Sequence, residues 1–317
     1  MSLNFVYCFD ENFNIQALTS INSLLNKLTV KANIFIIHKN IETFTEELKL
    51  IKSHSNLEHV FIYQFDSSKT VLPPIKSHVS EATFYRLFLS HYLPSNIKNL
   101  VYMDADIVCI NNPTERFNNL FSEMDDEETI IAAKTEGAGE NYKKIFERLD
   151  LQNNEYFNAG VIAINYFKWL DQEVEIHLLK ILENRFDDIF DYDQEVLNIY
   201  FDGRYTKLDK HLNYQAIGGF DIELINYIED NVYFLHYLGK GKPWSVENFI
   251  FPTSKFYQRE FNHLGFNKPH LIFPKKFHIV KQFLSIILKL DFLKFDKPFL
   301  FLKYSFLAFF SKKFKSF

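Results

Sequence analysis

Apolar strand-like segments alternate with helical segments through the first 65 residues, and this alternation is the strongest constraint on the fold. Short apolar runs with the length of strands occupy residues 3–9, 32–37 and 59–65. Between them, residues 13–28 repeat apolar side chains at helical spacing, and residues 42–51 form a second helical segment. Strand, helix, strand, helix, strand is the pattern of a parallel sheet covered by helices. The sequence therefore predicts an α/β fold.

Polar residues stand at the ends of two predicted strands. Asp10 and Asn12 follow the first strand, whereas Asp104 and Asp106 interrupt the apolar stretch Leu100–Ile110, LVYMDADIVCI. Ligands of open α/β sheets bind at the carboxyl ends of the strands, so we expect the two polar clusters to face one crevice. Carboxylates two residues apart in a strand point the same way and suit a hard divalent cation. A polar turn is the simple alternative for so short a motif.

Two further segments carry candidate binding residues. Arg86 lies in an otherwise apolar helical segment over residues 81–92, where it either extends to solvent or pairs with an anion. Gly160 lies near the start of a predicted strand over residues 156–165, where a glycine permits close backbone approach to a ligand. A simple turn is the alternative for this glycine. Residues 136–142 are predicted to form a loop.

Three more polar positions follow in the second half of the chain. Asp193 opens a predicted helix, and its simplest role is an N-terminal cap. His236 ends a short predicted strand, where a lone histidine is more often a hydrogen-bonded residue than a ligand. The loop that follows contains Gly239 and Lys242, which can wrap a phosphate or form a solvated turn.

Composition restricts the class of protein further. Hydrophobic residues make up 47% of the chain, which is enough for a full core. Cys8 and Cys109 lie in apolar runs, so we expect both to be buried and free. The first residues lack the basic and apolar regions of a signal peptide. No run of about eighteen apolar residues, the length of a spanning helix, is present.

Charge is distributed unevenly. Residues 268–317 contain eleven Lys and two Asp, a net charge of +9, which leaves the remaining acidic body with −14. An acidic body argues against nucleic-acid binding. Residues 279–290 repeat apolar side chains at helical spacing, and residues 299–310 are nearly all apolar. Both segments suit helices lying on an anionic membrane surface, the alternative being an extension packed on the body or on a partner subunit.

Six motifs follow one another along the chain: Asp10-Glu11-Asn12, Thr83-x-x-Arg86, Asp104-Ala105-Asp106, Phe157-Asn158-Ala159-Gly160-Val161, Asp193-Gln194 and His236-Tyr237-x-Gly239-x-Gly241-Lys242-Pro243-Trp244. Taken together, these motifs resemble the eighth family of retaining glycosyltransferases, in particular its bacterial lipooligosaccharide α-galactosyltransferases, and more distantly glycogenin. The resemblance spans about residues 3–250. It implies a Rossmann-like nucleotide-diphospho-sugar transferase fold of the GT-A type, with a mixed, mostly parallel sheet and helices on both faces.

The resemblance also implies an activity, which is metal-dependent retaining transfer of galactose or glucose from a UDP-sugar. Asp104, Asp106 and His236 would bind Mn²⁺, with Mg²⁺ as the alternative, and the diphosphate would complete the coordination sphere. The implied donor-binding residues are Asp10, Asn12, Val79, Thr83, Arg86, Asp104, Ala105, Asp106, Asn158, Ala159, Asp193, Gln194, His236, Gly239 and Lys242. Glu136 and His78 stand near implied acceptor contacts, and Leu238 departs from the small or polar residue of close relatives.

Gln194 and Asp193 are the implied catalytic residues. An amide is a poor nucleophile, so we favour attack on the same face of the sugar. The departing phosphate would take the acceptor's proton, and Gln194 would stabilise the oxocarbenium-like state. The alternative has Asp193 as a transient nucleophile.

Two other functions could use the same metal–diphosphate site. The first is a nucleotide-sugar hydrolase or pyrophosphorylase. A pyrophosphorylase would need a Gly-rich basic loop after the first strand, and residues 10–13 lack one. A non-catalytic nucleotide-sugar-binding module is the other, and it would be expected to have lost a metal ligand.

We therefore predict a catalytic domain over residues 1–267 and a membrane-associating helical tail over residues 268–317. The predicted function is hexosyl transfer in lipooligosaccharide, lipopolysaccharide or other surface-glycan synthesis. The predicted partners are a UDP-hexose donor, a glycan or glycolipid acceptor and an anionic membrane, with no nucleic acid. The predicted location is cytoplasmic, on the inner face of the cytoplasmic membrane.

Overall fold

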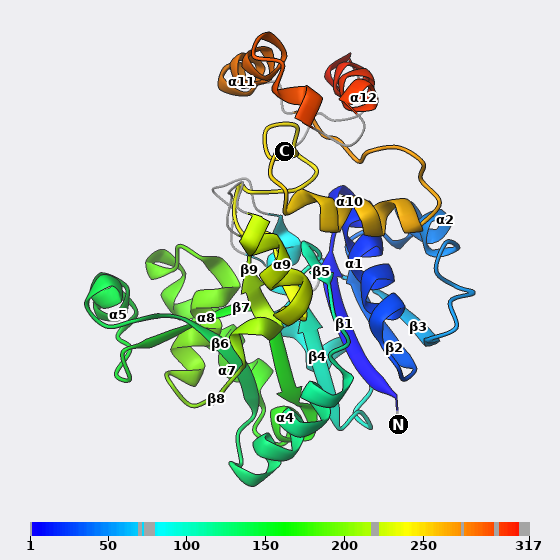
Figure 1. The fold of residues 1–317 in the computed structure, drawn as a ribbon. Coiled ribbons are helices and arrows are strands. Elements are labelled where there is room, and N and C mark those ends of the chain that lie inside the picture. The colour runs from blue at the N-terminus through cyan, green and yellow to red at the C-terminus, as the bar shows by residue number, and fades with distance from the viewer. Residues whose placement is uncertain are drawn as a thin grey trace.

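A seven-stranded sheet forms the centre of the molecule (Figure 1). The computed structural model describes residues 2–68, 72, 80–216, 222–273, 276–294 and 298–310. Within this part of the chain the strand order is β3–β2–β1–β4–β7–β6–β8. The strands are β1 (Leu3–Phe9), β2 (Ala32–His38), β3 (Leu57–Gln64), β4 (Asn99–Met103), β6 (Ile131–Ala138), β7 (Glu155–Asn165) and β8 (Thr206–Lys207).

The sheet is mixed and mostly parallel. β1 pairs in parallel with β2 and β4, β2 with β3, and β6 with β8, whereas β7 runs antiparallel to both β4 and β6. The parallel strands are nearly continuous apolar runs because helices cover both of their faces. The predicted Rossmann-like α/β architecture is therefore confirmed.

Alternate side chains of β1 enter two separate cores, as the two-residue period of a strand requires. Phe5 and Tyr7 pack in the core covered by α1 and α4, whereas Val6 and Cys8 pack in the core covered by α7 and α8. The α-helices of the body are α1 (Asn14–Lys27), α2 (Thr45–Leu48), α3 (Leu89–Tyr92), α4 (Thr114–Asp126), α5 (Lys143–Leu149), α6 (Tyr166–Asp171), α7 (Val174–Arg185), α8 (Tyr192–Phe201), α9 (Ile222–Asn231) and α10 (Ser254–His263). Cys8 and Cys109 are buried and free, as predicted.

A second sheet of three strands stands beside the first. Its order is β5 (Ile107–Cys109), β10 (Phe234–His236) and β9 (Tyr214–Gln215), with β10 antiparallel to β5 and parallel to β9. Its apolar side chains pack with α9 and α10 in a third core. The turn over residues 104–106 leaves β4 of the large sheet and enters β5 of the small one. This turn therefore joins the two sheets.

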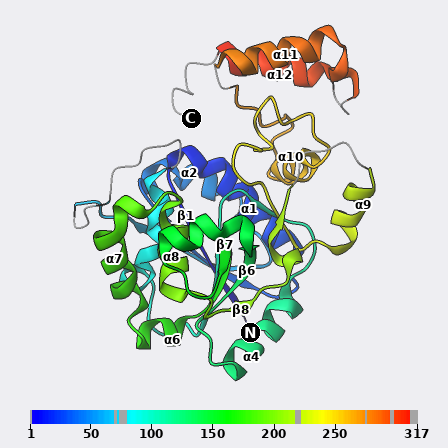
Figure 2. The same ribbon diagram turned by 90° about the vertical axis from the view of Figure 1, so that its left-hand side faces the viewer.

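The tail forms two helices that lie side by side beyond α10 (Figure 2). They are α11 (Phe277–Leu288) and α12 (Pro298–Phe310), and Pro298 begins the second, a position that proline favours. Phe283 and Phe301 are buried between them in a fourth core that also includes Val246 of the body. No helix in the described ranges is long and apolar enough to cross a bilayer.

Several local predictions differ from the structure. The segment over residues 81–92 is a 3₁₀ helix, η3 (Glu81–Phe88), that continues into α3. The predicted loop over residues 136–142 is wrong because β6 continues to Ala138 and a 3₁₀ turn follows. The polar residues of this segment lack the apolar pattern that would predict a strand. The strand pairs with β7, with two shifts in the pairing register. β7 begins at Glu155, so Gly160 lies inside the strand and not at its start.

Candidate functional site

A cavity of about 260 Å³ opens at the carboxyl ends of β1 and β4. Its lining combines residues that are far apart in the chain: Cys8, Phe9, Asp10, Phe13, Ser80, Ala82, Thr83, Arg86, Asp104, Ala105, Asp106, Gly239 and Lys242. A larger cavity of about 830 Å³ lies at the opposite ends of these strands, but it contains none of the predicted site residues. The two predicted polar clusters thus share one crevice.

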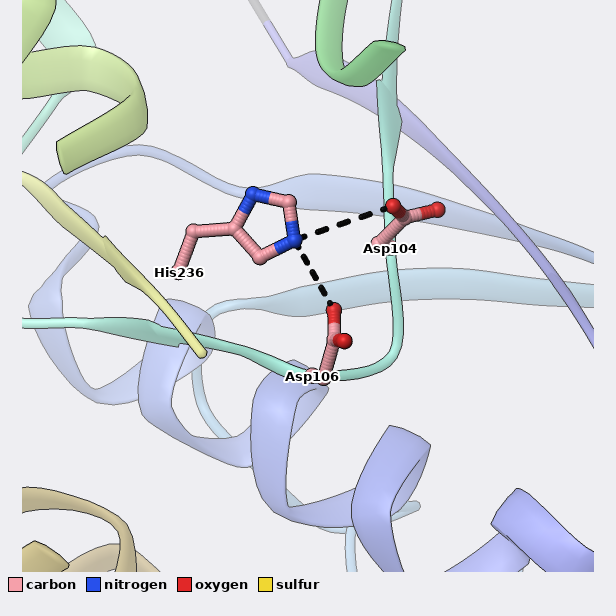
Figure 3. A group of neighbouring side chains, drawn as sticks. All are labelled: Asp104, Asp106 and His236. Carbon is pink, nitrogen blue, oxygen red and sulfur yellow. Dashed lines mark ion pairs between the residues drawn. The ribbon is translucent and has the colours of Figure 1, made fainter. Parts of the chain in front are cut away.

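Three candidate metal ligands converge at the edge of this cavity (Figure 3). Asp104 follows β4 and Asp106 precedes β5, while antiparallel pairing places His236 of β10 opposite Ile107. The His236 Nε2 atom lies 3.3 Å from Asp106 Oδ1 and 3.9 Å from Asp104 Oδ2. The carboxylates converge through the turn between two strands, and not through the strand period that the sequence suggested.

The surroundings of these atoms fit a divalent cation. The Oδ1 atom of Asp106 is buried and accepts no hydrogen bond within the described chain. The other ring nitrogen of His236, Nδ1, lies 2.9 Å from the side-chain oxygen of Asn213. If Nδ1 carries the proton that this contact requires, the lone pair of Nε2 faces a carboxylate oxygen. Two carboxylates and one neutral imidazole are a donor set suited to Mn²⁺ or Mg²⁺.

Lys242 contacts the other carboxylate oxygen of Asp106, Oδ2. Its ammonium group donates to the Asp106 carboxylate and, at 2.7 Å, to the backbone oxygen of Tyr237. Burial by itself would raise the pKa of Asp106, but the ammonium group of Lys242 outweighs burial and holds that pKa below its usual value. Asp106 therefore stays ionised, which is the state that a metal ligand requires.

Arg86 is buried and paired, and it does not extend to solvent. Its guanidinium contacts Asp104 Oδ1 and Asp193 Oδ2, each at 2.7 Å, and donates to the Ala159 backbone oxygen at 2.6 Å. It also lies 4.0 Å from the centre of the Tyr102 ring. One cation thus joins a candidate metal ligand to the predicted sugar-binding carboxylate.

Asp193 is 3% exposed and lies in the first turn of α8. Burial raises its pKa to about 6, although Arg86 and the Thr83 hydroxyl oppose that shift. The residue at the N-cap of α8 is Asp191, so the simple capping role considered for Asp193 is wrong.

Gln194 is held against β7 by a group of amides. Its Oε1 atom accepts the Ala159 backbone N–H at 2.9 Å, and its Nε2 atom donates to the Tyr156 hydroxyl at 3.1 Å. The Asn158 Nδ2 atom donates to Glu136 at 3.2 Å, which brings a carboxylate to the same place. The predicted residues on β7 and α8 therefore form one cluster beside the metal ligands.

The first loop supplies the other end of the cavity. Asp10 caps a 3₁₀ turn by accepting the Asn12 backbone N–H at 3.0 Å, and the Ser80 hydroxyl donates to its second oxygen. The ring of Phe13 lines the cavity and packs edge-on against Trp244 with ring centres 6.2 Å apart. Val79 and His78, which the sequence also suggested, lie outside the described residues.

Two glycines serve different needs at this site. A Cβ atom at Gly160 would lie 2.2 Å from His236 Cε1, so the close approach predicted there is made by the histidine ring. Gly239 has a φ of +54°, in the left-handed region that glycine tolerates best.

Sequence reasoning missed Phe13, Ser80, Tyr102, Tyr156 and Asn213. Phe13 begins the helical segment over residues 13–28, and the helical pattern gives no sign that its ring lines a cavity. Its place beside the Asp10 motif was the available signal. Asn213 stands outside every motif, and no local pattern in the sequence marks it.

Residues 4–247 match the profile of glycosyl transferase family 8. The lipopolysaccharide 1,3-galactosyltransferase of Salmonella typhimurium is 26% identical over 263 residues, covering 80% of this chain and 76% of that protein. The lipopolysaccharide 1,2-glucosyltransferase of Escherichia coli K12 is 27% identical over 270 residues, covering 81% and 76%.

Solved structures share the fold. The galactosyltransferase LgtC, in complex with donor and acceptor sugar analogs, superimposes with a TM-score of 0.64 at 17% identity, covering 82% of this chain and 96% of that one. GlyE of Streptococcus pneumoniae gives 0.61 at 20% identity, covering 83% and 62%. At these identities the likeness establishes the GT-A-like fold alone. The profile match spans most of the chain, so this protein is a glycosyltransferase and belongs to glycosyl transferase family 8.

Proposed function

We propose that this protein is a metal-dependent, retaining hexosyltransferase that moves galactose or glucose from a UDP-sugar to a surface-glycan acceptor, such as lipopolysaccharide. The convergence of Asp104, Asp106 and His236 at the edge of one cavity is the observation that carries the proposal. The printed names of the bacterial relatives, a galactosyltransferase and a glucosyltransferase acting on lipopolysaccharide, support the sugar and the acceptor.

The cavity offers separate surfaces for the parts of a UDP-sugar. The Phe13 ring and the Asp10 carboxylate, at the end of β1, suit a planar base with an N–H donor. Lys242 and the backbone at Gly239 supply the positive charge and close approach that a diphosphate requires. The sugar would then reach Arg86 and Asp193, whose charged groups can read its hydroxyls.

A divalent ion held by Asp104, Asp106 and His236 would neutralise charge on the departing diphosphate. The protein's own groups do the rest in the proposed reaction. Lys242 adds positive charge beside the leaving group, and Gln194 offers an amide dipole to the oxocarbenium-like state. The acceptor hydroxyl attacks the same face, and the leaving phosphate oxygen accepts its proton.

The contacts of Asp193 favour this route over a covalent intermediate. One of its oxygens accepts the Thr83 hydroxyl and the other faces Arg86 Nε at 2.7 Å. These two contacts and the burial of Asp193 would hold its carboxylate in a fixed orientation beside the sugar. We therefore propose that Asp193 binds and orients the sugar.

A donor screen tests the proposed function. Purified protein is incubated with single UDP-hexoses, with and without acceptor glycans, while release of UDP is followed. We expect release with UDP-galactose or UDP-glucose that depends on acceptor, is lost with a chelator and returns with Mn²⁺. NMR of the product should show an α-linkage. A β-linkage would exclude retention, and equal release without acceptor would favour a nucleotide-sugar hydrolase.

We further propose that the tail holds the enzyme on an anionic membrane. α11 and α12 bury Phe283 and Phe301 between them but leave many large apolar side chains on their outer faces. Phe277 is 87% exposed and Leu288 is 83% exposed. The other exposed members on the two helices are Leu284, Phe299, Phe306, Leu307 and Phe310, and Leu290 and Leu293 are exposed in the segment between the helices. Exposed Lys281, Lys289 and Lys303 accompany them, which is the composition of an interfacial helix.

Sedimentation with vesicles tests the tail. The intact protein should pellet with anionic vesicles at low salt and remain in the supernatant with neutral ones. Ile272 packs in the core of the body and pairs with Ser245, so a truncation should keep residues up to Lys276. This truncation should stay in the supernatant yet remain active on free sugars.

The matched variant Phe277→Ser/Leu288→Ser/Phe299→Ser keeps every Lys and the buried Phe283 and Phe301. It should lose most vesicle binding. Unchanged binding of this variant, or an unfolded truncation, would show that the tail is a structural extension of the body.

A further inference from the structure

We propose that Asn213 is a positioning residue that fixes the ring of His236 for metal binding and connects it to Gln194. This inference rests on the proposed metal-dependent function. Asn213 ends a 3₁₀ turn just before β9 and is completely buried. Parallel pairing of Tyr214 with Leu235 and of Gln215 with His236 fixes the backbone of Asn213 beside β10.

The direction of the hydrogen bonds around Asn213 can be deduced from one backbone group. The N–H of Gly160 donates to Asn158 Oδ1 at 3.0 Å, and a backbone N–H can only donate. This contact identifies the oxygen of the Asn158 amide. The same oxygen lies 2.8 Å from the Asn213 side chain, which must therefore present its Nδ2 there.

The orientation of Asn213 then decides which nitrogen of His236 carries the proton. With Nδ2 directed at Asn158, the Oδ1 atom of Asn213 faces His236 Nδ1 at 2.9 Å. An amide oxygen only accepts, so Nδ1 is the protonated nitrogen. The lone pair of the neutral ring is thereby placed on Nε2, the atom that faces Asp104 and Asp106.

Steric contact holds the ring in the same place. The Gly160 backbone is so close to the imidazole that a Cβ atom there would lie 2.6 Å from His236 Nδ1. The ring is 2% exposed and cannot turn over without losing the Asn213 contact. Outer hydrogen bonds of this kind fix the tautomer and orientation of metal-ligating histidines in general.

The chain of hydrogen bonds continues beyond the metal ligand. Asn158 uses its Nδ2 atom to contact Gln194 Oε1 at 3.3 Å and Glu136 at 3.2 Å. Asn213 and Asn158 therefore connect the ring of His236 with the amide proposed to face the anomeric carbon. A shift at either end would be passed to the other through two buried amides.

Nitrogen NMR of the His236 ring tests the assignment on protein free of metal and donor. Spectra are recorded at alkaline pH, where the single proton of a neutral imidazole can be assigned to one of its two ring nitrogens. We expect the wild-type ring to carry its proton on Nδ1. Because this measurement requires neither ion nor activity, it can fail independently of the proposed function. A wild-type ring protonated on Nε2 would overturn the proposal without any variant.

Two substitutions separate the links made by Asn213. Asn213→Ala removes both and should lose the Nδ1–H preference and weaken Mn²⁺ binding by about 10-fold to 100-fold. Asn213→Asp keeps an oxygen for Nδ1–H but places a second oxygen against Asn158. It should therefore retain the tautomer and Mn²⁺ affinity, while kcat falls.

Asn165→Ala is the matched control. Asn165 is also buried, donates to Asp125 at 2.8 Å and lies at the far end of β7. It should leave the ring and Mn²⁺ affinity unchanged. Affinity is read from the free Mn²⁺ signal by electron paramagnetic resonance, and folding from thermal unfolding. If folded Asn213→Ala keeps the wild-type His236 tautomer and the wild-type Mn²⁺ affinity, the proposal is overturned. If Asn213→Ala does not fold, Asn213→Asp provides the test.

Discussion

Replacing Asp106 with Asn is expected to lower kcat/KM for hexosyl transfer by about 10²-fold or more. A metal ligand that stabilises developing charge is worth several kcal/mol, and each 1.36 kcal/mol is about tenfold in rate. Asp106 is the better test than Asp104, because Asp104 also pairs with the buried Arg86. Asn keeps an acceptor for Lys242, so the fold should survive.

The loss should appear together with weaker Mn²⁺ binding. Steady-state rates at several Mn²⁺ concentrations measure it, and Asp125→Asn is a control because Asp125 pairs with Lys98 on the surface. Wild-type activity of Asp106→Asn at low Mn²⁺ would mean that this carboxylate is not a metal ligand.

Replacing Arg86 with Met is expected to lower the free energy of unfolding by about 3–5 kcal/mol, as is usual when one partner of a buried ion pair is removed. Asp193 is 3% exposed and would lose its only described cationic contact, while Asp104 would lose a 2.7 Å partner. Urea denaturation measures the change. Arg86→Lys should cost less, because the charge remains although the forked geometry does not.

The pH dependence of this loss follows from Asp193. Burial already raises its pKa to about 6, and removing Arg86, which lowers that pKa, must raise it further. At low pH the variant's carboxyl is neutral in both states, whereas at higher pH the folded variant must bury an unpaired charge or keep a proton that the unfolded chain releases. The loss should therefore be larger at pH 8 than at pH 5. The double variant with Asp193→Asn should recover part of it. A change below about 1 kcal/mol at pH 8, the size of an exposed pair, would contradict the buried ion pair.

The sequence predicted those parts of the fold that depend on local pattern. The period of β1 and α1 is set by neighbouring residues, so their bounds were close to correct. The three candidate metal ligands were also found, since Asp104 and Asp106 form a motif and His236 ends an apolar strand. The roles of these residues in metal binding and catalysis stay predictions.

Other features depend on pairing that no local pattern records. Asn213 contacts His236 only because β9 and β10 pair in parallel. From the sequence alone, the Arg86 side chain could extend into solvent or pair with an anion. In the structure it is buried and pairs with Asp104 and Asp193. Residues 136–138 have the composition of a loop. They belong to a strand because β6 continues to pair with β7 beyond two shifts in register, which the local sequence does not show.

The turn between β4 and β5 gives the candidate metal site a mechanical role. Asp104 belongs to the end of the large sheet, whereas Asp106 and His236 belong to the small one. An ion bound by all three residues would cross-link the large sheet to the small one. The described cysteines form no disulfide that could do the same. At about 100 times its Kd, a bound ion adds about 2.7 kcal/mol to the folded state. Metal supply would then set the rigidity of the enzyme as well as its chemistry.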